Sequence, residues 1–231
     1  MRVWSETLSG NSHIKIAPSI LSADFAQLGK YVAMASDAGA DSVHVDIMDG
    51  QFVPSITWGP KTVEAIKRWS NVPLDVHLMI YNPENHIDSF TEAGADTINV
   101  HIESSNHLNK TIQQIRNGGA RAGVAINPST AIDVLEDLLP FIDQVLVMSV
   151  NPGLPGQKYI PGSEEKILRV SEMILKANLP VTIEVDGGIN ISTAQLAVDA
   201  GAHILVAGSA IYDHKDGVKA AIDSLRESIL I

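Results

Sequence analysis

Three apolar segments of the sequence each carry histidine or carboxylate residues two positions apart: His44 and Asp46, Asp75 and His77, and Glu184 and Asp186. In an extended strand, residues two positions apart lie on the same face. Two imidazoles and two carboxylates can therefore converge from three strands. Such a set of nitrogen and oxygen ligands suits Zn²⁺ and other divalent transition metals.

A single inward-facing histidine is more often a hydrogen-bonded core residue than a metal ligand. Three such segments favour the ligand interpretation, because an unpaired buried charge is costly and a cation offsets it. Of the remaining histidines, His101 could line the same pocket. Four others fall in predicted helices or at the start of predicted elements and are interpreted as structural: His86, His107, His203 and His214.

Glycine-rich segments follow three later apolar segments, at 151–157, 187–190 and 208–210. Backbone N–H groups of such loops, together with a helix N-terminus, can bind a phosphate. Few basic side chains lie near them, Lys158 being the closest in sequence, so amides would provide most of the binding. With a metal and two carboxylates nearby, this pattern indicates a phosphorylated small molecule that loses a proton beside its carbonyl group.

Short β-branched runs alternate with amphipathic stretches along the chain. Strands joined by helices run parallel, and eight such units predict an α/β fold of the (β/α)₈, or TIM-barrel, type. The expected strands are 15–21, 42–47, 74–80, 97–102, 121–126, 144–150, 181–186 and 203–208. The expected helices include 25–37, 60–69, 83–93, 107–117, 164–177 and 216–229.

A weak repeat supports this division, because similar glycine-containing quartets precede four of the expected strands, at 38–41, 93–96, 118–121 and 200–203. Their glycines can adopt the left-handed conformation that ends a helix. An open, doubly wound sheet is the alternative, but residues 17–21 supply no Gly-x-Gly-x-x-Gly turn. In a barrel the chemistry lies at the C-terminal ends of the strands, where the carboxylates and glycine-rich segments fall.

The chain is acidic, with 27 Asp and Glu against 16 Lys and Arg and a net charge of −11. This charge disfavours nucleic acid and membranes as partners, and no apolar run approaches the roughly 20 residues of a transmembrane helix. Because the sequence has no cysteine, a metal must be held by histidines and carboxylates. Residues 1–13 are polar, so we expect an N-terminal extension, one barrel domain at 14–231, and a soluble protein in the cytoplasm.

Several segments, in order along the chain, resemble the ribulose-phosphate 3-epimerase family: 17–24, 44–50, 52–54, 75–79, 148–153, 184–188 and 207–211. The resemblance implies a barrel of the ribulose-phosphate-binding type. It implies an isomerase that interconverts D-ribulose 5-phosphate and D-xylulose 5-phosphate in the pentose phosphate pathway. It also implies a homo-oligomer, dimer or hexamer, with one divalent metal ion per subunit: Zn²⁺, Fe²⁺, Mn²⁺ or Co²⁺, of which we expect Zn²⁺.

Matching the family's motifs to this sequence implies a role for each site residue. The implied metal ligands are His44, Asp46, His77 and Asp186, with Asp46 as proton acceptor and Asp186 as proton donor. The three methionines of the site resemble a thioether cap over the substrate, although core filling is the alternative interpretation. The implied substrate-binding residues are Ser19, Met48, His77, Met79, Met148, Gly153, Leu154, Pro155, Gly156, Gly187, Gly188, Gly208 and Ser209.

Two positions depart from the family pattern. Pro155 replaces a glycine of the 151–157 loop and has no N–H to donate, and Ser55 stands where asparagine is common. Another ketose phosphate, such as D-allulose 6-phosphate or a tetrulose phosphate, is therefore an alternative substrate. A barrel that only binds phosphosugars is a further alternative, but it should lack at least one of the four ligands. A metal-free barrel lyase would carry lysine or glutamate in place of the histidines.

Overall fold

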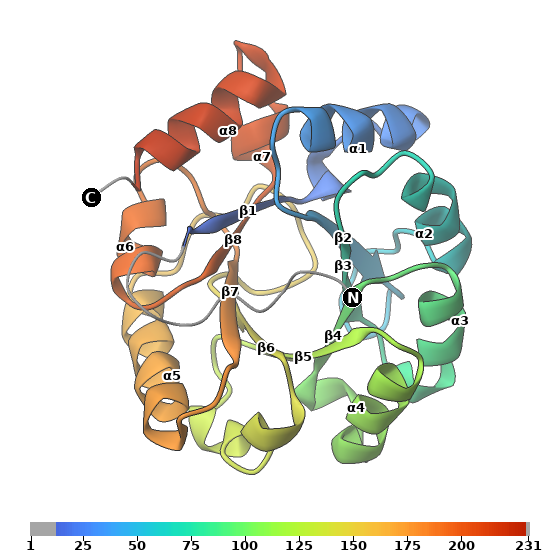
Figure 1. The fold of residues 1–231 in the computed structure, drawn as a ribbon, viewed down its shortest axis with the longest axis vertical. Coiled ribbons are helices and arrows are strands. Elements are labelled where there is room, and N and C mark those ends of the chain that lie inside the picture. Colours follow the sequence, from blue (N-terminus) through green and yellow to red (C-terminus); the bar gives the residue numbers. More distant parts are fainter. Residues whose placement is uncertain (1–12, 230–231) are drawn as a thin grey trace.

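The computed structural model describes residues 13–229, so all but the last residue of the predicted extension 1–13 lies outside the described part. Parallel strands form an inner ring, with helices outside it (Figure 1). The strands are β1 (Lys15–Pro18), β2 (Val43–Met48), β3 (Leu74–Met79), β4 (Thr97–His101), β5 (Arg121–Ile126), β6 (Gln144–Met148), β7 (Thr182–Asp186) and β8 (Ile204–Ala207). Each lies inside its predicted range or within one residue of it.

The sheet closes into a barrel. Its eight strands follow the order β1-β8-β7-β6-β5-β4-β3-β2, and a parallel bridge between Ser19 and His44 joins the two ends. Between β2 and β3 the register pairs His44 with Asp75 and Asp46 with His77. The predicted TIM-barrel architecture is confirmed. The register places the histidine and aspartate side chains of β2 directly beside those of β3.

The helices lie on the outside of the barrel (Figure 1). They are α1 (Leu28–Asp37), α2 (Pro60–Lys67), α3 (Ile87–Glu92), α4 (Leu108–Asn117), α5 (Ser163–Ala177), α6 (Ala194–Asp199), α7 (Ser209–Tyr212) and α8 (Gly217–Glu227). Of these, α1 to α6 connect successive strands, and α7 and α8 follow β8. No helix within residues 13–229 is long and apolar enough to cross a membrane.

The crossing from β5 to β6 differs from the predicted strand–helix alternation. It consists of two short 3₁₀ helices, η5 (Ile132–Leu135) and η6 (Leu139–Phe141), in place of an α-helix. Pro140 has no N–H to donate and disfavours helical backbone in the residue before it. A continuous helix is therefore interrupted in this short segment.

The outward faces of the strands form the hydrophobic core with the helices. Val43, Val45 and Ile47 of β2 are at most 3% exposed and belong to the same cluster as Val63 and Ile66 of α2. Strands of a parallel sheet are covered on both faces, which is why they are rich in β-branched residues. Full burial of each such side chain stabilises the fold by about 1.5–3 kcal/mol.

A layer of buried polar side chains crosses the barrel interior. Asn99 Nδ2 donates to Asp75 Oδ1 at 2.7 Å, and Gln144 Nε2 donates to Glu184 Oε2 at 2.6 Å and to Asn99 Oδ1 at 3.2 Å. All four residues are at most 4% exposed. These hydrogen bonds link β3, β4, β6 and β7 beneath the inward-facing residues of the site, and among these groups Glu184 Oε1 is left without a hydrogen-bond partner in the described part of the chain.

Candidate active site

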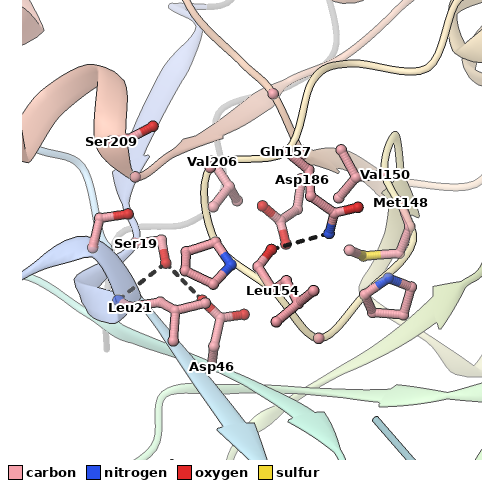
Figure 2. Close-up of a pocket in the computed structure, with 18 of the residues that line it drawn as sticks. Ser19, Leu21, Asp46, Met148, Val150, Leu154, Gln157, Asp186, Val206 and Ser209 are labelled. Atoms are coloured by element: carbon pink, nitrogen blue, oxygen red, sulfur yellow. Dashed lines mark hydrogen bonds between the residues drawn. The ribbon is translucent and has the colours of Figure 1, made fainter. Parts of the chain in front are cut away.

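A pocket opens at the C-terminal ends of the strands, where a barrel places its chemistry (Figure 2). Every residue that the sequence analysis expected to contact the substrate lines it except His77, which is fully buried. Asp46 and Asp186 also line it. The other lining residues are Leu21, Ser22, Val150, Pro152, Gln157, Ile189 and Val206.

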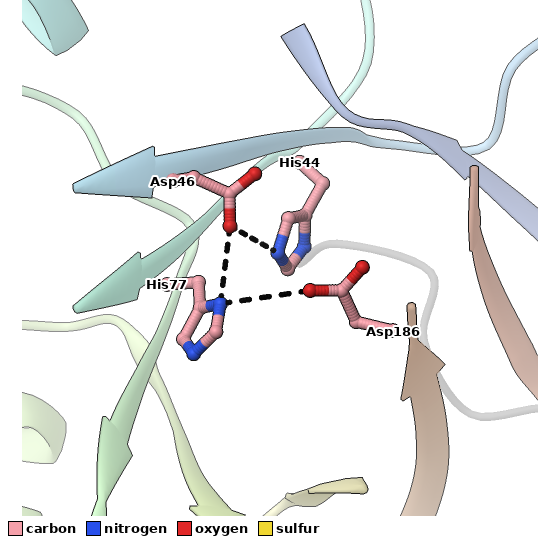
Figure 3. A group of neighbouring side chains, drawn as sticks. All are labelled: His44, Asp46, His77 and Asp186. Carbon is pink, nitrogen blue, oxygen red and sulfur yellow. Dashed lines mark hydrogen bonds and ion pairs between the residues drawn. The ribbon is translucent and has the colours of Figure 1, made fainter. Parts of the chain in front are cut away.

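The four predicted metal ligands meet at one point of the barrel interior (Figure 3). Asp46 Oδ1 lies 3.5 Å from His44 Nε2 and 3.2 Å from His77 Nδ1. His77 Nδ1 lies 3.9 Å from Asp186 Oδ2. One donor atom from each of the four side chains lies within 4.8 Å of all the others. Two adjacent strands and β7 thus direct two imidazoles and two carboxylates at the same centre.

The donor set fits a divalent metal ion. Ligand lengths of about 2.0–2.2 Å in a tetrahedral site put the donor atoms roughly 3.4 Å apart, which is close to the distances found here. His44 supplies a second observation. Within the described residues its buried Nε2 has no hydrogen-bond partner, whereas its Nδ1 lies 3.4 Å from Asp75 Oδ2 and 3.5 Å from Glu184 Oε1. The unpartnered nitrogen is the one that faces the other ligands.

The two carboxylates of the centre differ in proton affinity. Burial and the neighbouring charge of Asp46 raise the pKa of Asp186 to about 7. Burial also acts to raise the pKa of Asp46, but the positive charge of His44 outweighs it and lowers this pKa well below its usual range. In the absence of a cation, Asp46 is therefore ionised, whereas Asp186 is about half protonated near pH 7.

The two imidazoles of the centre also differ. Burial lowers the pKa of His77 to about 4, against the opposing charge of Asp46, so His77 is neutral. Burial acts in the same direction on His44, but the carboxylates of Asp46, Asp75 and Glu184 raise its pKa well above the usual range. The carboxylates around this position thus stabilise positive charge, as a cation site requires.

Ser19 holds one of the carboxylates in place. Its hydroxyl donates to Asp46 Oδ2 at 2.6 Å and accepts the backbone N–H of Leu21 at 3.3 Å (Figure 2). The second bond caps the short 3₁₀ helix η1 (Ile20–Ser22), which follows β1. Ser19 therefore lines the pocket, and its proton is directed at the Asp46 oxygen that does not face His77.

Glycines form the rim of the pocket after β7 and β8. Gly188 has a φ of +66°, and a Cβ there would lie 2.2 Å from the backbone nitrogen of Tyr159. Only glycine fits this close approach, which leaves backbone exposed to the pocket. Gly208 precedes α7, and its carbonyl accepts the N–H groups of Ile211 and Tyr212, whereas the N–H groups of Ser209 and Ala210 have no acceptor within the helix. None of the described lining residues is lysine or arginine.

The loop after β6 covers one side of the pocket. Gln157 Nε2 donates to the carbonyls of Asn151 and Leu154, at 2.6 and 3.0 Å, and holds the loop in a closed turn. The hydroxyl of Ser55, from the loop after β2, donates to Gly153 O at 2.6 Å. Ser55, which departs from the family pattern, is therefore a tether between two loops.

His101 is not among the lining residues, contrary to the possibility raised by the sequence. It is fully buried, and its Nε2 lies 2.8 Å from His77 Nε2. Glu103, which the sequence analysis did not identify, lies behind it, with Oε2 3.1 Å from His101 Nδ1. His101 ends β4 and Glu103 lies two positions later, and this spacing could have identified Glu103 from the sequence.

The four histidines interpreted as structural do not belong to any candidate metal group among the described residues: His86, His107, His203 and His214. His203 instead accepts the backbone N–H of Ile183 at its Nδ1, at 3.0 Å. Sequence reasoning missed several lining residues. Val150 could have been found because it lies two positions after Met148. Gln157 could have been found because it is the last residue of the glycine-rich segment 151–157.

Solved structures with low sequence identity share the fold. KGPDC from Streptococcus mutans has a TM-score of 0.70 and 13% identity, with 94% of this chain and 97% of that chain covered. Orotidine 5′-phosphate decarboxylase from Pyrococcus horikoshii OT3 has a TM-score of 0.65 and 16% identity, with 93% and 98% covered. These similarities support the barrel architecture alone.

Closer relatives share the sequence. A ribulose-phosphate 3-epimerase from Bacillus subtilis (strain 168) is 50% identical over 216 residues, covering 93% of this chain and 99% of that protein. The chloroplastic ribulose-5-phosphate-3-epimerase of Arabidopsis thaliana is 47% identical over 211 residues, covering 90% and 75%. The Escherichia coli (strain K12) enzyme is 41% identical, covering 93% and 95%. A family model described as "Ribulose-phosphate 3 epimerase family" matches residues 15–212. The chain therefore belongs to the ribulose-phosphate 3-epimerase family of isomerases.

Proposed function

We propose that the protein interconverts D-ribulose 5-phosphate and D-xylulose 5-phosphate by inverting C3 of the sugar. Inversion requires one group to take the C3 proton from one face and another to return a proton to the opposite face. The observation that carries the proposal is that Asp46 on β2 and Asp186 on β7 both line the pocket and both face His77 Nδ1. The two carboxylates come from different strands and can act as separate proton-transfer groups.

We assign Asp46 as the acceptor and Asp186 as the donor when ribulose 5-phosphate is the substrate. The assignment follows the family's motifs, in which the Asp of His-x-Asp accepts the proton and the Asp of Asp-Gly-Gly donates one, here Asp46 and Asp186. The hydroxyl of Ser19, 2.6 Å from Asp46 Oδ2, keeps the acceptor oriented and lies at the pocket wall, where it can contact a substrate hydroxyl. In the reverse direction the two carboxylates exchange roles.

His44, Asp46, His77 and Asp186 would hold one divalent ion, and we expect Zn²⁺, with Fe²⁺, Mn²⁺ and Co²⁺ as alternatives. When bound, such an ion stabilises the negative charge of the enediolate that forms when C3 loses its proton. Met48, Met79 and Met148 line the pocket beside this centre and are at most 3% exposed. Their apolar thioethers would exclude water from the reacting carbon.

The phosphate of the substrate would lie against the glycine rim. The backbone around Gly153, Gly156, Gly187 and Gly188, with Gly208 and Ser209 at the start of α7, lines the pocket and supplies amides for an anion. Leu154 and Pro155 belong to the same rim, and Pro155 has no N–H to donate. Phosphate binding would therefore depend on backbone geometry and on the closed turn of the β6 loop.

Proton NMR in D₂O tests the proposal. Purified protein with D-ribulose 5-phosphate should incorporate deuterium at C3 while D-xylulose 5-phosphate appears, and chelation of the metal should stop both. Absence of exchange after addition of Zn²⁺, Mn²⁺, Fe²⁺ or Co²⁺ would reject the pentulose assignment. The same assay with tetrulose and hexulose phosphates, D-allulose 6-phosphate among them, then measures whether the Pro155 loop selects another ketose phosphate.

Assembly as a homo-oligomer, either dimer or hexamer, and location in the cytoplasm stay predictions from the sequence. Light scattering on the purified protein measures the first, and cell fractionation measures the second. Neither result alters the proposed chemistry, because all residues assigned to the reaction come from one chain.

A further inference from the structure

Two buried imidazoles meet edge to edge beside the candidate metal site. His77 Nε2 and His101 Nε2 are 2.8 Å apart, both rings are fully buried, and the ring centroids are 4.9 Å apart with planes 29° from parallel. Stacked rings would have their nearest atoms about 3.5 Å or more apart. The 2.8 Å separation is instead that of an N–H···N hydrogen bond, so one nitrogen carries a proton and the other a lone pair.

Glu103 determines which nitrogen carries the proton. Its Oε2 lies 3.1 Å from His101 Nδ1, and its Oε1 accepts the backbone N–H of Asn127 at 2.9 Å and the hydroxyl of Thr130. Burial opposes ionisation, but these hydrogen bonds lower the pKa of Glu103 to about 2. An ionised carboxylate only accepts hydrogen bonds, so His101 Nδ1 must be the donor.

The position of the His101 proton determines the tautomer of His77. With the His101 proton on Nδ1, beside the Glu103 carboxylate, its Nε2 is an acceptor, and the proton between the rings belongs to His77 Nε2. His77 Nδ1 then has a lone pair, and this atom faces Asp46 at 3.2 Å and Asp186 at 3.9 Å. We propose that Glu103, acting through His101, is a positioning residue that holds His77 in the tautomer whose Nδ1 can bind a metal ion. This inference rests on the metal site of the proposed function.

The other imidazole of the centre has a carboxylate partner without an intermediate ring. His44 Nδ1 lies 3.4 Å from Asp75 Oδ2, and its Nε2 faces the site. Carboxylates behind metal-binding histidines fix the tautomer and raise ligand basicity. At His77 the carboxylate lies one ring further out, and the ring of Phe52, with its centroid 4.8 Å from that of His101, packs against this second imidazole.

Glu103 also joins the loop after β5 to the barrel. A purely structural role in holding this loop is therefore the competing explanation for Glu103. Lys166 Nζ donates to the carbonyls of Asn127 and Thr130, at 2.5 and 2.6 Å, and braces the same loop. Thr130→Val removes a loop contact of Glu103 but leaves its Oε2 beside His101. This variant is the matched control for the loop role.

Glu103→Gln should reverse the tautomers of both His101 and His77. The amide has a single acceptor oxygen, and the loop presents two donors to it, so the NH₂ group would face His101 Nδ1. His101 would then carry its proton on Nε2 and donate to His77, which would move its own proton to Nδ1. His101→Phe removes the acceptor altogether and frees His77 to protonate Nδ1 toward Asp46.

The test is ¹⁵N NMR of the histidine side chains in the metal-free protein, combined with Co²⁺ affinity measured by competition with a chelator. Wild type and Thr130→Val should show His77 protonated at Nε2 and His101 at Nδ1, with equal Co²⁺ affinity within about twofold. Glu103→Gln and His101→Phe should show His77 protonated at Nδ1 and bind Co²⁺ about 10–100-fold more weakly.

A wild-type His77 protonated at Nδ1 would overturn the inference, as would a Glu103→Gln protein with unchanged tautomers and unchanged Co²⁺ affinity. The tautomer readout requires neither metal nor turnover, so it stays decisive if wild type binds no Co²⁺, a result that would reject the metal site of the proposed function instead. If His101→Phe fails to fold, Glu103→Gln alone decides, since it keeps the shape of the side chain.

Discussion

The hydroxyl of Ser55 donates a 2.6 Å hydrogen bond to the carbonyl of Gly153, which joins the loop after β2 to the loop after β6 across 98 positions of sequence. Gly153 lines the pocket beside Leu154 and Pro155. The bond therefore connects the segment that holds Asp49 and Phe52 to the loop that would close over a bound phosphate.

Ser55→Ala should raise the KM for the ketose phosphate and leave kcat nearly unchanged. Loss of one hydrogen bond of about 0.5–1.5 kcal/mol corresponds to a KM increase of roughly 2–10-fold. Ser55→Thr keeps the hydroxyl and is the control, with a KM near that of wild type. Steady-state kinetics measure both constants, and a fall in kcat at constant KM would show that the tether acts on the chemical step instead.

Replacing either acid–base carboxylate should nearly abolish C3 proton exchange. Asp46→Asn and Asp186→Asn remove a proton-transfer group, an effect worth about 10²–10⁴-fold in rate. Deuterium incorporation by NMR measures the loss. Near wild-type exchange in either variant would contradict the two-carboxylate mechanism.

Asp49→Asn is the control for those variants. The Asp49 carboxylate accepts the backbone N–H groups of Gln51, Phe52 and Tyr81 and does not belong to the pocket lining. An amide oxygen keeps part of this bonding, so exchange should fall by less than about tenfold. Circular dichroism spectra of all three asparagine variants should match wild type.

Metal removal should destabilise the folded protein as well as stop the reaction. A cation at 100 times its Kd stabilises the fold by about 2.7 kcal/mol. For a chain of this size that corresponds to a fall in Tm of roughly 5–10 °C after chelation. Calorimetry with and without chelator measures it. In Asp186→Asn, which lacks one ligand, chelation should shift Tm less, and an equal shift would place the cation elsewhere.

Gly188→Ala should destabilise the protein more than Gly162→Ala. Both glycines have positive φ, +66° and +89°, but an alanine Cβ at position 188 would lie 2.2 Å from Tyr159 nitrogen, whereas nothing lies within 4 Å at position 162. Backbone strain alone costs about 1–2 kcal/mol, and the clash adds about 1–3 kcal/mol. Urea denaturation compares the two. Equal losses would mean that the pocket rim adjusts without cost.

The stability difference between wild type and Glu103→Gln should depend on pH. Glu103 has a pKa of about 2 in the folded chain against about 4.5 when unperturbed, so ionised Glu103 stabilises the fold above pH 4.5. This contribution disappears as the pH falls through about 2. Solvent screens this partly exposed carboxylate, so urea denaturation of both metal-free proteins should show a difference of about 1 kcal/mol at pH 7 that shrinks as the pH falls from 5 toward 2. A stability difference that stays constant with pH would contradict the lowered pKa of Glu103.

The sequence predicted the strands well because their signal is local. A period of two in β2 places His44 and Asp46 on one face and Val43 and Val45 on the other, and this follows from backbone geometry alone. The crossing from β5 to β6 was less predictable. There the effect of Pro140 on the backbone outweighs the expected alternation of strand and helix.

The tertiary structure decided which of these side chains meet. His77 and Asp186 belong to β3 and β7, which are not neighbours in the sheet, and only barrel closure brings them to one centre. The contact of His101 with His77, and of Glu103 with the loop at Asn127, depends on strand register and on loop packing. A one-residue change of register would turn every side chain to the other face, and no local period specifies register. Sequence thus determined which groups were available, and packing determined their partners.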